Sequence, residues 1–100
     1  MVEHASVVRI TYLEPVDGKR DELLAVLRRV AETTRSAEGN FGAQACSADD
    51  RPDAVVEVSR WRDRSDLDAF LRERGQEILD VVGPLLSAAP EPRHYTSLSD

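Results

Sequence analysis

Trp61 ends the most clearly patterned apolar segment of the chain and shares a predicted strand face with two polar residues. If residues 54–61 form a strand, alternate side chains point the same way, so Glu57 and Ser59 lie on the face of Trp61. An electron-rich substrate ring would stack on the indole while Glu57 accepts a phenolic proton, and burial would raise the carboxyl pKa to suit this role. The alternative is a core or interface tryptophan beside a glutamate that pairs with an arginine across the sheet.

Four further side chains are candidates for the same site. Tyr12 would donate a hydrogen bond from the first strand, and His94 would move a proton near neutral pH. Asn40 would point its amide into the pocket mouth, and Phe70 would contact the substrate from the second helix. The alternatives are a half-buried strand tyrosine, a surface histidine and an asparagine that serves the turn after Gly39.

Three arginines alternate around Trp61 at positions 60, 62 and 64, with aspartates at positions 63, 66 and 68. They either attract an acidic substrate or a carrier-bound acyl group, or form surface ion pairs with the aspartates. Cys46 suits either a redox role or a small buried position. No cluster of cysteine, histidine and carboxylate has the spacing of a metal site, and no glycine-rich phosphate loop is found.

The length and charge of the chain limit what it can bind. One hundred residues fit one domain, 1–100, with a core from about 7 to 98. A net charge of -6 and an isoelectric point of about 4.9 argue against nucleic acid and anionic membranes, which need a basic surface. No apolar run spans a bilayer, no secretory signal is visible and there is one cysteine, so we expect a cytoplasmic protein.

The apolar periodicity predicts the elements that would position these side chains. Strands are expected at 7–12, 40–46, 54–61 and 93–99, and helices at 19–36 and from Ser65 to about 86. Asp17 and Ser65 are the predicted N-caps, Gly39 ends the first helix, and Gly75 is expected to kink or break the second. The order β-α-β-β-α-β predicts an α+β, ferredoxin-like fold, in which both helices cover one face of a four-stranded antiparallel sheet.

The strands carry apolar residues on both parities. Val55 lies on one parity and Val58 on the other, and Ile10 and Val7 are divided in the same way. A strand that is wet on one side alternates more cleanly. We therefore expect the uncovered sheet face to meet the same face of a second subunit.

Three stretches, 15–24, 37–42 and 55–70, resemble the antibiotic-biosynthesis monooxygenase domain of dimeric α/β barrel proteins. The last of them, with its strand, glutamate, tryptophan and helix start, is the most specific. The resemblance implies a homodimer with facing sheets and a pocket between sheet and helices in each subunit. Members of the family include oxygenases that oxidise phenolic polycyclic substrates to quinones without metal or flavin, haem-degrading enzymes and isomerases.

Two departures from the family pattern restrict the mechanism. Haem-degrading members need a histidine on the second helix, and residues 72–79 contain none, so we expect no haem. We expect no other cofactor either, because a substrate anion reacts with dioxygen more readily than its neutral form. The quinone-forming members use an asparagine and a tyrosine around the tryptophan, where this chain has Glu57 and Leu67. Three hypotheses remain: a cofactor-independent monooxygenase of a small aromatic or phenolic substrate, an isomerase or cyclase, and a non-catalytic dimeric binding module.

Overall fold

A computed structural model describes residues 6–98 of the chain. Its elements follow in the order β1 (Val7–Leu13), α1 (Arg20–Arg35), β2 (Asn40–Ser47), β3 (Val55–Trp61), α2 (Arg64–Val82), a 3-10 turn (Gly83–Leu85) and β4 (Glu91–Thr96). The predicted α+β, ferredoxin-like order is confirmed. The last predicted strand, 93–99, begins and ends earlier in the structure, and its position 99 lies outside the described residues. No helix within residues 6–98 is long and apolar enough to cross a membrane.

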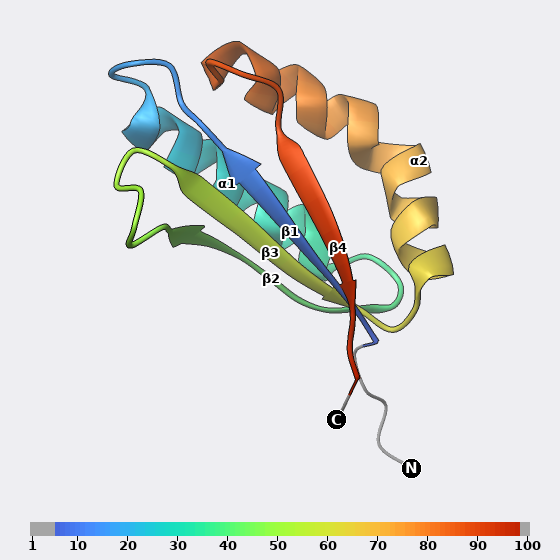
Figure 1. The fold of residues 1–100 in the computed structure, drawn as a ribbon. Coiled ribbons are helices and arrows are strands. Elements are labelled where there is room, and N and C mark those ends of the chain that lie inside the picture. Colours follow the sequence, from blue (N-terminus) through green and yellow to red (C-terminus); the bar gives the residue numbers. More distant parts are fainter. Residues whose placement is uncertain (1–5, 99–100) are drawn as a thin grey trace.

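The four strands form one antiparallel sheet in the order β2-β3-β1-β4. Both helices lie on the same side of this sheet (Figure 1). In the central pair, Thr11 is opposite Glu57 and Arg9 is opposite Ser59. Because side chains alternate along a strand, these four residues and Trp61 all point toward the helices.

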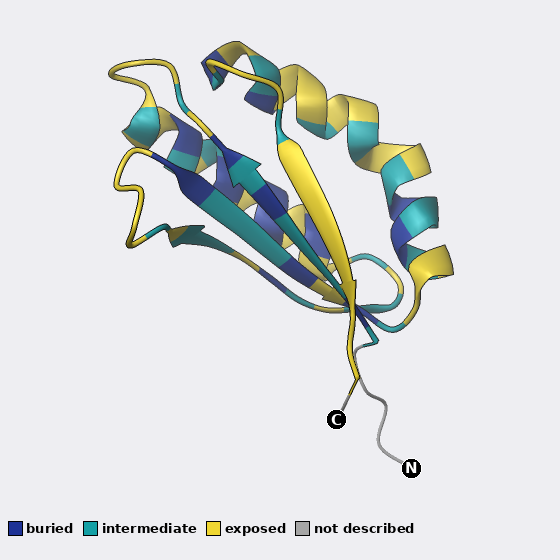
Figure 2. Cartoon of the chain, in the orientation of Figure 1, coloured by how far each residue is buried: buried dark blue, intermediate teal, exposed yellow. Residues whose placement is uncertain are grey.

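Two apolar clusters fill the space between helices and sheet. The larger joins α1 and the end of α2 to the sheet and consists of Leu13, Leu23, Leu27, Val30, Val55, Val82 and Leu85. The smaller lies under the start of α2 and consists of Val7, Trp61, Leu67 and Phe70. Figure 2 shows the buried residues of β1 and β3 interspersed with half-buried ones, while β4 is exposed along its whole length.

The other side of the sheet, which we call the open face, carries the second parity of apolar residues. Its apolar members are Val8, Ile10, Tyr12, Val56, Val58 and Tyr95. No helix covers them, and Tyr95 is 48% exposed. The two-sided apolar pattern expected from the sequence is therefore present in the folded chain.

The helices differ from the predictions at both N-caps and at Gly75. Lys19, and not Asp17, is the N-cap of α1, and no side chain caps that end. Asp63, and not Ser65, caps α2, because its extended backbone lets Oδ1 accept the backbone N–H of Asp66 at 3.0 Å. Gly75, which lines the cavity, does not interrupt α2, because one glycine inside a helix costs only about 1 kcal/mol relative to alanine.

A tight junction fixes the end of β3 against the start of β2. The backbone N–H of Arg62 donates to the carbonyl of Gly39 at 2.7 Å, and Arg62 clasps Asp66 through Nε and Nη2 at 2.9 and 3.1 Å. Gly39 has a φ of 78°, and a Cβ at this position would collide with the Asp66 carboxylate. The junction thus holds the strand end that carries Trp61.

Replacing Gly39 by alanine is expected to destabilise the protein more than the same change at Gly18. Both residues have positive φ, which costs alanine about 1 kcal/mol or more, but a Cβ at Gly18 has nothing within 4 Å. Gly39→Ala must also displace Asp66 from Arg62, so we expect a total loss of about 2–4 kcal/mol. Urea unfolding at equal protein concentration measures both losses, and equal values would contradict the role of the Gly39–Asp66 contact.

Candidate functional site

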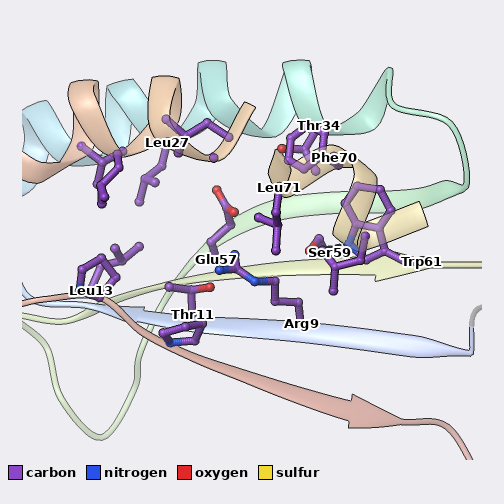
Figure 3. Close-up of a pocket in the computed structure, with 17 residues that line it drawn as sticks. Arg9, Thr11, Leu13, Leu27, Thr34, Glu57, Ser59, Trp61, Phe70 and Leu71 are labelled. Carbon is purple, nitrogen blue, oxygen red and sulfur yellow. Dashed lines mark hydrogen bonds between the residues drawn. The ribbon is translucent and has the colours of Figure 1, made fainter. Parts of the chain in front are cut away.

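A cavity of about 280 Å³ lies between α2 and the helix-covered face of the sheet. Its walls include members of both apolar clusters, with Phe70, Leu71 and Ile78 contributed by α2. Its polar side chains come mainly from the central strands (Figure 3): Arg9, Thr11, Glu57 and Ser59. The surface inside is largely apolar with a few grouped polar atoms, which is typical of a small-molecule site.

Glu57 is the most unusual polar residue of this cavity. Its Oε2 is buried and has no hydrogen-bond partner among residues 6–98. Burial raises the pKa of Glu57 from 4.5 to about 6, although the nearby positive charge of Arg9 acts in the opposite direction. A carboxyl group of this kind exchanges a proton close to neutral pH and has an unused acceptor for a ligand.

Arg9 lies beside Glu57 without pairing with it directly. Its Nε donates a hydrogen bond of 3.2 Å to Nε2 of His94 on the neighbouring strand β4. Burial lowers the pKa of Arg9, while the charge of Glu57 raises it. An arginine was expected to pair with Glu57 across the sheet. Arg9 is that neighbour, but it acts on Glu57 only through its charge and is hydrogen-bonded to His94.

Trp61 forms one end of the cavity and is only 1% exposed. Its ring centroid lies 5.2 Å from that of Phe70, and its Nε1 donates to Oγ of Ser59 at 2.9 Å. So little indole surface is free that a substrate ring cannot lie flat on it. This burial agrees with the interpretation of Trp61 as a packing residue. Phe70 is also buried, packs against Trp61 and lines the cavity.

The remaining candidate residues lie outside the cavity lining. Tyr12 is on the open face, so its expected place in the same pocket as Glu57 is wrong, because its parity on β1 points away from the helices. Asn40 is at the β2 bulge, where Oδ1 accepts the N–H of Gly42 at 2.9 Å and Nδ2 is buried without a partner among the described residues. His94 is on the helix-covered side but reaches the site through Arg9.

Arg9 and Thr11 line the cavity but were not among the residues predicted for the site. Both occupy the parity of β1 that faces the helices, beside the buried Val7 and Leu13. Arg9 could have been found from the sequence, because it is a charged residue among β-branched ones on a predicted central strand. A half-buried arginine at such a position usually has a specific role. The prediction instead followed the apolar alternation of Val8, Ile10 and Tyr12, which lie on the open face.

The arginines that follow β3 belong to surface ion pairs. Arg62 pairs with Asp66 at 2.9 Å, and Arg64 pairs with Asp68 at 3.0 Å, so the ion-pair interpretation is confirmed for both. Arg60 points to the open face and is exposed. Among residues 6–98, no three histidine, cysteine or carboxylate side chains are grouped as they would be around a metal ion.

Comparisons with known proteins agree with this architecture. The sequence profile of the family described as antibiotic biosynthesis monooxygenase matches residues 6–77. No curated protein sequence shows a significant match.

Several solved structures share the fold at low sequence identity. A Nitrosomonas europaea protein of unknown function superposes with a TM-score of 0.84 and 16% identity, covering 99% of this chain and 95% of its own. The Mycobacterium tuberculosis protein Rv0793 gives a TM-score of 0.81 and 24% identity over 96% of this chain and 98% of its own. A Deinococcus radiodurans protein, provisionally named an antibiotic biosynthesis monooxygenase, gives 0.84 and 16% over 94% of both chains. With the profile match over most of its length, the chain belongs to the antibiotic biosynthesis monooxygenase family.

Proposed function

We propose that the protein is a cytoplasmic, cofactor-independent monooxygenase that oxidises a small aromatic or phenolic, quinol-like substrate in the cavity between sheet and helices. Membership of the family supports monooxygenase chemistry in general. The observation that supports this substrate class is the partnerless, buried carboxyl oxygen of Glu57 in a largely apolar cavity. The apolar walls suit aromatic rings, and the carboxylate suits a hydroxyl proton.

In this reaction Glu57 takes the proton of a substrate hydroxyl. The resulting anion is more electron-rich than the neutral phenol and therefore gives up electrons to dioxygen more readily. A ring C–H becomes C=O with one oxygen atom of dioxygen, and the phenolic C–O⁻ becomes the second carbonyl. The other oxygen atom leaves as water with the two hydrogens lost by the substrate, so all electrons come from the substrate itself.

An oxygen electrode tests the proposal with a panel of phenols and fused-ring hydroquinones. The protein is dialysed against a chelator, and no flavin, nicotinamide or metal is added. We expect saturable oxygen uptake with one quinone formed per dioxygen consumed. Conversion of a substrate without oxygen uptake would instead identify an isomerase or cyclase. Neither oxygen uptake nor any conversion across the panel, or turnover that requires added haem, would contradict the proposal.

We also propose that two copies associate through their open faces. The half-buried Ile10 and Val58 at the centre of this face support the pairing, because a cluster of apolar residues on a sheet surface is stabilised by being covered. Light scattering at micromolar concentration is expected to give twice the chain mass of 11.1 kDa. A stable wild-type monomer would contradict this assembly. Val58→Glu, which places a charge at the centre of the open face, is expected to be monomeric.

A further inference from the structure

Arg9 has hydrogen-bonding capacity that the protein leaves unused. Its Nε is bound to His94, but neither Nη1 nor Nη2 has an acceptor among the described residues. The side chain lines the cavity, and Figure 3 shows it extending along the sheet toward Glu57. A half-buried guanidinium with free N–H groups favours an anionic acceptor, and the nearby Glu57 acts on Arg9 through its charge without accepting a hydrogen bond from it, so the Nη groups are available to a ligand.

His94 keeps Arg9 in this orientation. Because Nε2 of His94 accepts the Arg9 N–H, that nitrogen is unprotonated and the imidazole is neutral. Burial, followed by the charges of Arg64 and Arg9, lowers the pKa of His94, whereas Asp68 raises it. A neutral acceptor therefore fixes one edge of the guanidinium and leaves the Nη edge for a ligand.

Proton transfer to Glu57 has a requirement that Arg9 can meet. An ordinary phenol has a pKa of about 10, about four units above the pKa of about 6 of Glu57, so transfer between them is unfavourable without help. A positive charge within a few ångströms lowers the pKa of an acid by about 1–3 units. A cation next to the base therefore makes the substrate anion accessible near neutral pH.

We propose that Arg9 binds the oxyanion of the substrate, so that the ligand of this cavity is an aromatic molecule with an acidic phenolic or enolic hydroxyl, held between Arg9 and Glu57. The hydroxyl lies toward β1 and β3, and the rings lie toward Phe70, Leu71 and Ile78 of α2. Arg9 and Glu57 then act on one proton: Glu57 accepts it, and Arg9 stabilises the negative charge left on oxygen. This inference rests on the proposed substrate class but not on the reaction with oxygen.

The test uses 4-nitrophenol as the probe, because its anion absorbs visible light that the neutral form does not. It is titrated into the full chain without oxygen, at a pH below the pKa of the free probe. 4-Nitroanisole, which has the same ring but cannot ionise, measures occupancy of the apolar walls. The variants are Arg9→Gln, Glu57→Gln and, as a charge-matched control, Arg72→Gln on the exposed side of α2.

The two site variants are expected to move the ionisation of the bound probe in opposite directions. The wild-type protein and Arg72→Gln should bind part of the probe as its anion. Arg9→Gln should abolish that signal and weaken binding of the anion at least tenfold, with 4-nitroanisole binding unchanged. Glu57→Gln should increase the bound anion, because the competing negative charge is gone while Arg9 remains.

Each contrary result has a definite meaning. Unchanged probe ionisation in Arg9→Gln, equal loss of 4-nitroanisole binding, or no binding of either probe by the wild type would overturn the role of Arg9. Anion binding in a protein that consumes no oxygen would leave the role of Arg9 intact and contradict only the oxygenase. Oxygen uptake that is unaffected by Arg9→Gln would contradict only the role of Arg9.

Discussion

Glu57→Gln is expected to lower kcat/KM for an aromatic substrate by about two to four orders of magnitude, the range in which a general base contributes. Glutamine keeps the size of the side chain but cannot accept the proton. In the wild type, kcat/KM should fall as the pH drops through about 6, because protonated Glu57 is inactive as a base. Glu73→Gln, an equivalent change on the exposed side of α2, is the control and should retain full activity.

The same variant is expected to be more stable than the wild type at neutral pH. Because burial raises the pKa of Glu57 to about 6, the folded chain holds this proton more tightly than the unfolded chain does. The stability from this group is full at low pH and falls as the pH rises from about 4.5 through 6, by about 2 kcal/mol. Glutamine does not ionise, so its advantage should appear over this pH range.

Measuring both properties separates chemistry from folding. Urea unfolding at pH 5 and pH 7.5 gives the stability of the variant relative to the wild type, and steady-state assays give its activity. A Glu57→Gln protein that loses activity and also loses stability at pH 7.5 would contradict the destabilising burial of an ionised Glu57. Full activity in this variant would remove Glu57 from the mechanism.

Trp61→Ala is expected to reduce the free energy of unfolding by about 3–5 kcal/mol, which is the usual cost of emptying an aromatic position in a core. The indole is 1% exposed, contacts Phe70 and donates to Ser59, so the alanine variant loses packing and leaves the Ser59 hydroxyl without its donor. Loss of this magnitude is a large part of the stability of a small domain.

Trp61→Phe is the matched comparison, since it keeps an aromatic ring and removes the N–H donor. Its loss should be about 1–3 kcal/mol. Both variants should be measured at one protein concentration, because association of subunits contributes to apparent stability. A loss below about 1 kcal/mol for Trp61→Ala would show that the indole is not a packing residue and would favour direct contact with substrate.

Most of the fold follows from periodicity along the chain. The spacing of Leu23, Leu27 and Val30 predicts α1 because it places them on one face of a helix, and the structure buries that face. The β-branched residues of β3 predict a strand, which the structure also has. Helix starts were less predictable, because Asp63 and Ser65 are both good caps in sequence. The choice depends on which residue has extended backbone, and that is fixed by how β3 leads into α2.

The candidate site was predictable only along one strand. The grouping of Glu57, Ser59 and Trp61 needs nothing beyond alternation within β3, and the structure has it. The neighbours of that group come from β1, whose more apolar parity faces away from the helices, contrary to the usual arrangement. Tyr12 was therefore assigned to the cavity and Arg9 was overlooked. Alternation shows which residues share a face of the sheet, but it does not show which face the helices cover.

Alternation on β1 and β3 also determines which substitutions affect each surface of the sheet. Each cavity residue on these strands is flanked in sequence by residues of the open face, so Glu57 stands between Val56 and Val58. Substitutions on the helix-covered face of these strands change the cavity and leave the open face unchanged. Point changes therefore act on one surface at a time, whereas a single-residue insertion in β3 would exchange the two surfaces and destroy both.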